Sequence, residues 1–152
     1  FWNSAILGPL FLVSGLSAAA AMIILGAREK VERALFAQVD AWLIAVELLL
    51  VGLLIIGLAT GGGAQLHALE LVMSGPYALV FWGVFVTVGL AIPLLLEIWE
   101  IRGGARALVL IAPLLVLLGG YALRHVTLDL GQASTWQDYA TQYDPALLQR
   151  LK

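Results

Sequence analysis

Three acidic residues, Asp40, Glu47 and Glu97, stand inside or at the ends of long apolar stretches, where carboxyl groups are best placed to carry chemistry. A charged residue near the centre of a membrane helix costs about 2.5 to 3.5 kcal/mol on insertion scales, so Glu47 is expected to face protein or water. Asp40 precedes Glu47 by seven residues, which is about two helical turns. Both carboxyl groups are therefore expected on one helix face.

Buried carboxyl groups of this kind have two ordinary uses in membrane proteins. They relay protons, or they pair with polar groups of neighbouring helices and hold the structure together. The pattern predicts a candidate proton route through Asp40 and Glu47, with Glu97 joining them from the same membrane face. Structural pairing of Glu47 is the alternative, and the residues alone leave both open.

A second polar group, Arg124, His125, Asp129 and Gln132, lies near the end of the last apolar stretch. Such a cluster is able to bind a quinone head group, guide protons or hold a partner subunit. The alternative for Arg124 is an anchor whose long side chain reaches toward the headgroups. His67 is expected to be solvated at the interface.

The remaining composition excludes several classes of site. The chain has no cysteine, which removes disulfides and cysteine ligation of zinc or iron-sulfur clusters. Its two histidines lie in separate segments, and neither is clearly inside an apolar stretch as a haem ligand would be. The formal net charge is -2, so the chain lacks the excess of basic residues that nucleic-acid binding requires. We expect no catalytic residue, no metal site and no covalently bound cofactor in this chain.

The elements that position these residues follow from hydrophobicity. Of the 152 residues, 62% are hydrophobic and 12% charged, and the mean hydropathy is +0.99, which soluble domains do not show. Four stretches are long enough to cross about 30 Å of hydrocarbon at about 1.5 Å per residue. They cover residues 5–26, 39–60, 77–96 and 107–124. The predicted fold class is an all-α membrane protein with a four-helix bundle over residues 1–126.

Two shorter segments lie outside the predicted spans. Residues 64–74 place apolar side chains at helical spacing, which predicts a short amphipathic segment at the interface. These side chains are Leu66, Leu69 and Met73. Residues 127–152 are more polar and are expected to form a C-terminal tail outside the membrane.

Small residues and one proline predict how the spans pack. The first span carries small side chains four residues apart, and this spacing lets helix backbones approach closely. The candidate packing residues are Gly8, Ser14, Gly15, Ala18 and Ala19. Pro93, inside the third span, predicts a kink.

Basic residues predict the orientation of the chain. The first and third connections contain Lys or Arg, and the second contains neither; the basic residues are Arg28, Lys30, Arg33, Arg102 and Arg106. The positive-inside rule places the first and third connections in the cytoplasm. Both ends of this segment are then expected to face the periplasm of a bacterium.

Three stretches resemble one membrane-protein family. They are residues 2–21 (WNSAILGPLFLVSGLSAAAA), residues 81–97 (FWGVFVTVGLAIPLLLE) and residues 119–132 (GGYALRHVTLDLGQ). In this order and at these span positions, they resemble the NrfD family, the quinone-interacting membrane subunits of polysulfide reductase-type complexes. The last stretch carries a glycine pair, an arginine and a terminal GQ like those of the family.

This resemblance implies a function and a set of partners. Family members have eight spans in two four-helix bundles, and the three stretches resemble the second bundle, so the chain, which starts with Phe1, is expected to be the C-terminal half of a longer subunit. The resemblance implies a non-catalytic membrane anchor and quinone- or quinol-linked electron-transfer subunit in the bacterial inner membrane. The implied partners are an iron-sulfur protein subunit and a molybdenum catalytic subunit. Menaquinone or ubiquinone would be reached through the complex, because the family's quinone pocket is associated mainly with the first bundle.

The resemblance also gives Arg124 a place, and two other functions stay open. Arg124 falls on the family's C-terminal arginine, which implies a position near the iron-sulfur partner or a polar pathway. One rival function is a stand-alone small membrane transporter or proton channel that uses Asp40 and Glu47 without redox partners. The other is a purely structural anchor whose tail docks a soluble enzyme through Trp136, Tyr139 and Tyr143.

Overall fold

The computed structural model describes residues 4–102 and 110–133, and within these ranges the chain is helical and contains no strand. Among these described residues, four helical segments are long and apolar enough to cross a membrane. They are α1 (Leu7–Gly26), α2 (Lys30–Ala59), the joined helices η1 (Leu79–Ala91) and α4 (Ile92–Ile101), and α5 (Ile111–Ala133). These helices confirm the predicted all-α, four-span fold class.

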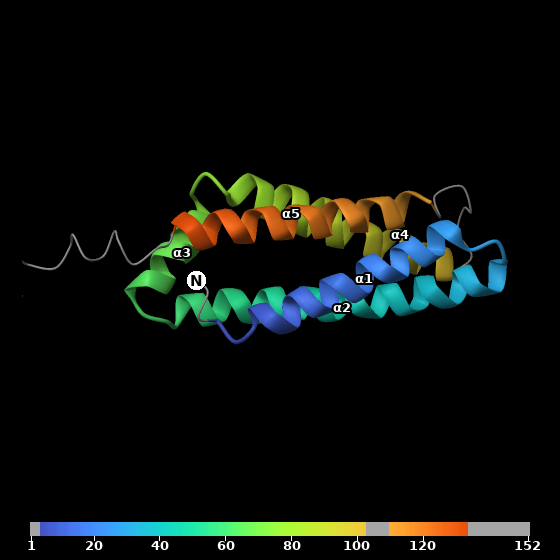
Figure 1. Cartoon of the computed structure of the whole chain (residues 1–152), viewed down its shortest axis with the longest axis horizontal. Coiled ribbons are helices and arrows are strands. Elements are labelled where there is room, and N and C mark those ends of the chain that lie inside the picture. The colour runs from blue at the N-terminus through green and yellow to red at the C-terminus, as the bar shows by residue number, and fades with distance from the viewer. Residues whose placement is uncertain (1–3, 103–109, 134–152) are drawn as a thin grey trace, which may run out of the picture.

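The long helices form two packed pairs that close into a bundle (Figure 1). α1 packs along α2, and η1 packs along α5; α1 also contacts α5, and α2 contacts α4. A short helix, α3 (Gly63–Met73), packs against α2 and lies at one end of the bundle. The start of α1 and the end of α5 lie at this same end, and the connection from α1 to α2 lies at the other (Figure 1).

Two helices extend beyond the predicted membrane spans. α2 begins at Lys30 and not near residue 39, and α5 continues past residue 124 to Ala133. Polarity marks where a helix leaves hydrocarbon, but charged residues such as Arg, Glu and Lys are good helix formers, so the helix itself need not end there. Arg33 lies in this extra part of α2 and donates a hydrogen bond of 2.8 Å to the carbonyl oxygen of Ala27. The predicted start of the last span at residue 107, and the tail beyond residue 133, lie outside the described residues.

The third span changes its helix type beside Pro93. Leu79–Ala91 is a π-helix, and an α-helix begins at Ile92, so that Pro93 lies in its first turn. Proline has no N–H group, so Pro93 donates no backbone hydrogen bond at the junction of the two helices. In the π-helical part, the Thr87 hydroxyl donates a hydrogen bond of 2.8 Å to the carbonyl oxygen of Trp82, five residues earlier. At the position of the predicted kink, the structure changes from π- to α-helical hydrogen bonding.

Two glycines set the contact between η1 and α5. A β-carbon built at Gly89 would lie 2.3 Å from the Cα of Gly119, and one built at Gly119 would lie 2.4 Å from the Cα of Gly89. No side chain fits between backbones at this separation. Close approach of this kind is how membrane helices gain dispersion contacts without a hydrophobic driving force.

Only part of the predicted small-residue surface of α1 is buried. Ser14 is buried, Gly15 and Ala18 are half-buried, and Gly8 and Ala19 are exposed, with open space around Gly8. Gly8 and Ala19 therefore lie outside the face of α1 that is buried within this bundle. Its members are Leu7, Leu10, Ser14, Ser17, Ala20, Ala21 and Ile24.

Candidate functional site

Two carboxyl groups and one hydroxyl group meet inside the bundle, each from a different helix. Ser17 of α1 and Asp40 of α2 are both 0% exposed, and Glu97 of α4 is 1% exposed. The Ser17 hydroxyl donates a hydrogen bond of 2.5 Å to Asp40 Oδ1. The Asp40 and Glu97 carboxyl groups lie close enough to interact directly. We refer to Ser17, Asp40 and Glu97 as the inner acid cluster.

Most of the oxygens in the inner acid cluster still have bonding capacity. Asp40 Oδ2 and both Glu97 carboxyl oxygens are buried, and none of the three reaches the geometry of a full hydrogen bond within the described residues. A buried polar atom without a partner costs about 1 to 3 kcal/mol, and more if it is charged. Two neighbouring carboxyl groups lower this cost by sharing a proton. The arrangement therefore suits proton exchange.

The rim of the inner acid cluster carries one more charge of each sign. Glu100, one turn beyond Glu97 on α4, interacts with Glu97 and with Arg33 of α2. Arg33 and Glu100 are both half-buried. They flank the cluster on the side of the α1–α2 connection, where the sequence predicts the cytoplasm.

Glu47 lies further along α2 and forms a second polar level. It is 2% exposed, and the hydroxyl of Ser14, also 2% exposed, lies beside its carboxyl group. Glu47 Oε1 is buried without a hydrogen-bond partner in the described part of the chain. Seven residues separate Glu47 from Asp40, which corresponds to a rise of about 10 Å along the helix.

The Arg124 side chain of α5 lies near Ser14 and Glu47, the residues of this second level. Its guanidinium Nη1 donates a hydrogen bond of 2.9 Å to the carbonyl oxygen of Gly120. A β-carbon at Gly120 would lie 3.1 Å from Nη1 and 3.6 Å from Ser14 Oγ. The charge of Arg124 also acts on Glu47. The head group of Arg124 therefore lies at the α1–α5 contact, although the residue as a whole is exposed.

The residues of the predicted cluster at the end of the last span do not lie together, because they are on different sides of α5. His125 Nδ1 lies 3.0 Å from Asp129 Oδ2, with side chains that are 58% and 38% exposed. Gln132 is also exposed. Adjacent residues of a helix point about 100° apart, so Arg124 faces the α1–α5 contact and His125 faces the outside. Arg124 thus belongs with Glu47, and His125 and Asp129 form a separate surface pair.

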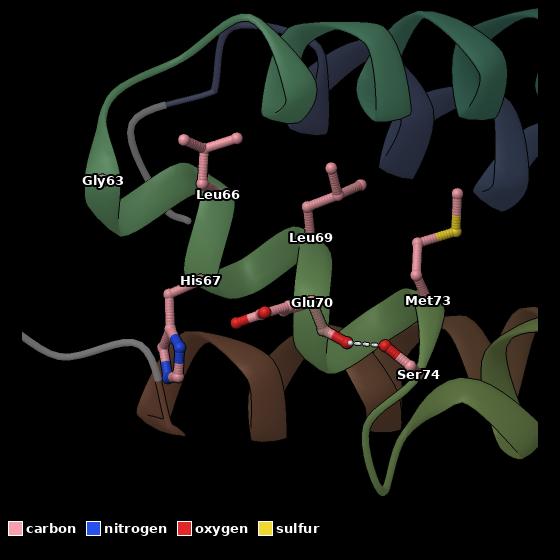
Figure 2. Close-up of a pocket in the computed structure, with 7 residues that line it drawn as sticks. All are labelled: Gly63, Leu66, His67, Leu69, Glu70, Met73 and Ser74. Atoms are coloured by element: carbon pink, nitrogen blue, oxygen red, sulfur yellow. Dashed lines mark hydrogen bonds between the residues drawn. The ribbon is translucent and has the colours of Figure 1, made fainter.

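A surface pocket at α3 is a weaker candidate for a site. It measures about 480 Å³ and is lined by one helix and the residue after it (Figure 2). Leu66, Leu69 and Met73 lie on one side of α3 and His67 on the other (Figure 2), as the predicted amphipathic pattern requires. In the described ranges 4–102 and 110–133, no three His, Cys, Asp or Glu side chains are grouped to hold a metal ion.

Sequence reasoning found the three buried acids but missed their hydroxyl partners. Asp40, Glu47 and Glu97 are all buried, and Asp40 and Glu97 are brought together as the shared membrane face predicted. The sequence pattern predicts only helix packing for Ser14 and predicts no polar role for Ser17. Their three-residue spacing on an otherwise apolar face was the available signal, because it puts both hydroxyls on one side of α1.

A comparison with known protein families gives a match over most of the chain. The family model described as "Polysulphide reductase, NrfD" matches residues 1–135, which is most of the chain. No match is found among curated proteins or among solved structures.

Proposed function

The chain belongs to the polysulphide reductase NrfD family, and from this membership we propose that it is a membrane anchor and quinone- or quinol-linked electron-transfer subunit with a proton route of its own. The family places it as a membrane subunit of polysulphide reductase-like complexes. In this proposal, its partners are an iron-sulfur protein and a molybdenum catalytic subunit. The chain supplies no redox centre, and menaquinone or ubiquinone is reached through the complex.

The observation that carries the proton route is the burial of three acids inside the bundle, Asp40 and Glu47 on α2 and Glu97 on α4. Carboxyl groups inside a membrane protein are costly to retain and often belong to proton relays. The hydroxyls of Ser17 and Ser14 lie beside these acids at the two levels. A hydroxyl both donates and accepts hydrogen bonds, so it is able to pass a proton between a carboxyl group and water.

The direction of the route follows from the predicted orientation. The inner acid cluster lies toward the α1–α2 connection, which carries basic residues and is expected in the cytoplasm of a bacterium. Glu47 lies deeper, and Arg124 approaches from α5. We therefore propose that protons enter at Asp40 and Glu97 and move to Glu47.

The surface pair of His125 and Asp129 has a different role in this proposal. Its side chains are 58% and 38% exposed on the outer face of α5. Polar groups facing hydrocarbon are costly, so such groups usually face protein or water. We assign this pair, with Gln132, to contact with a partner subunit.

The test uses the complete complex reconstituted in liposomes. Glu47→Gln keeps the size of the side chain and removes its exchangeable acid proton, so proton uptake coupled to quinol turnover should fall roughly 100-fold, a typical contribution of a positioned proton-transfer group. Glu32→Gln is the matched control, because Glu32 lies on the same helix and is exposed. A dye sensitive to pH reports the uptake.

Two results would contradict the proposal in different ways. Normal proton uptake by Glu47→Gln at normal complex yield would remove the proton route. Proton flux through the purified chain without quinol or partner subunits would instead favour the stand-alone channel.

A further inference from the structure

The Arg124 side chain runs back along α5 and does not extend toward the end of the helix. It lies nine residues from the end of α5 at Ala133 and thirteen from its start at Ile111. An anchoring side chain would extend toward the nearer end of the helix. The guanidinium instead donates a hydrogen bond of 2.9 Å to the carbonyl oxygen of Gly120, one turn earlier on α5.

Two glycines leave the space that the guanidinium occupies. A β-carbon at Gly120 would come within 3.1 Å of Nη1, and one at Gly15 would lie 4.0 Å from Nη2. The head group therefore lies over glycine positions of both α1 and α5. Ser14, which lies beside Glu47, is also close to this space.

Arg124 and Glu47 each have unused bonding capacity that matches the other. A guanidinium has five N–H donors, and the structure gives Arg124 one acceptor, the Gly120 carbonyl. Glu47 Oε1 is buried without a hydrogen-bond partner in the described residues. The two groups are not joined by an ion pair within 4.0 Å in residues 4–102 and 110–133, yet their charges interact. The charged groups acting on Glu47 are Asp40, on its own helix, and Arg124, while α1 offers the Ser14 hydroxyl.

We propose that Arg124 is a positioning residue that stabilises the carboxylate of Glu47 after its proton has left. In this step the Glu47 O–H bond breaks, the proton passes to a water molecule on the outer side, and the carboxylate left behind is balanced by the guanidinium. Reprotonation from the inner acid cluster then frees Arg124 to return to Gly120. The positive charge of Arg124 also opposes the entry of protons from outside. This inference rests on the proposed proton route.

The test measures the acid form of Glu47 and proton uptake separately. Infrared difference spectra of the complete complex detect the protonated carboxyl band of Glu47, which Glu47→Gln identifies by removing it. In Arg124→Gln, this band should persist to a pH about one unit higher, because an opposite charge nearby shifts such equilibria by about 1 to 3 units. Proton uptake per electron should fall about tenfold, and Arg124→Lys should recover part of both effects. Arg28→Gln, at an exposed site, is the control.

The double variant Arg124→Gln with Glu47→Gln completes the test. If Arg124 acts through Glu47, the double variant should take up protons no more slowly than Glu47→Gln alone. An unshifted Glu47 band in Arg124→Gln would overturn the inference, whatever the proton uptake. A shifted band together with normal uptake in Glu47→Gln would keep the charge coupling and remove the proton route.

Discussion

The hydroxyl of Ser17 supports a buried acid that would otherwise be difficult to retain. It donates to Asp40 Oδ1 at 2.5 Å, and both residues are fully buried. Hydrogen bonds to charged groups contribute about 1.5 to 3 kcal/mol. The contact therefore helps to keep Asp40 buried beside Glu97.

Ser17→Ala is expected to destabilise the protein. Removing the donor leaves Asp40 Oδ1 without its partner, so the free energy of unfolding should fall by about 1 to 3 kcal/mol. Chemical unfolding of the purified complex in detergent measures this loss. Ser74→Ala is the control, because Ser74 is exposed and its hydrogen bond to Glu70 is long, at 3.5 Å. Equal stability of the two variants would show that the Ser17 contact contributes little.

The pairing of η1 with α5 depends on backbone contact at Gly89 and Gly119. Their Cα atoms leave no room for a methyl group. This contact also fixes the position of α5, and Arg124 lies five residues beyond Gly119 on the same helix. Packing at the glycines and the direction of the guanidinium are therefore linked.

Gly89→Ala is expected to separate these two helices. The added methyl group would meet the Cα of Gly119 at 2.3 Å, and overpacking of this kind costs about 1 to 3 kcal/mol. Gly83→Ala is a matched control on the same helix, because a β-carbon there meets nothing within 4 Å. Yield and unfolding midpoint in detergent should fall for Gly89→Ala and stay near the parent value for Gly83→Ala. If both variants behave alike, the close approach of η1 and α5 is not needed for stability.

The bundle as a whole presents different connections at its two ends. α3, the start of α1 and the end of α5 lie at one end, and the α1–α2 connection lies at the other (Figure 1). A chain with four spans returns to the side on which it began. The proposed direction of proton entry depends on which end faces the cytoplasm.

Single cysteines test this orientation directly, because the chain has no cysteine. Glu29→Cys lies in the α1–α2 connection and His67→Cys on α3, and both positions are exposed. A maleimide that cannot cross membranes should label His67→Cys in intact spheroplasts and Glu29→Cys only after lysis. The opposite labelling pattern would reverse the proposed direction of proton entry, and labelling of both in intact cells would contradict the four-span topology.

The sequence by itself determined the four-span, all-α fold class and the burial of the acids. Span length and hydrophobicity are local properties, because every stretch of about 20 apolar residues needs the same thickness of hydrocarbon. The cost of a charge in that environment is equally local, so Asp40, Glu47 and Glu97 could be predicted to face protein or water. The helix ends at Lys30 and Ala133 could not, because polarity locates the membrane boundary and not the end of backbone hydrogen bonding.

Only the tertiary structure decided which polar groups meet. The Ser17 hydroxyl bonds to Asp40, Glu97 lies beside Asp40, and the charge of Arg124 acts on Glu47. These contacts result from the rotation and relative height of four helices. A rotation of about 100° per residue means that a shift of one position gives a side chain a different neighbour. Contacts such as Gly89 with Gly119 set that rotation, and they join residues far apart in the chain.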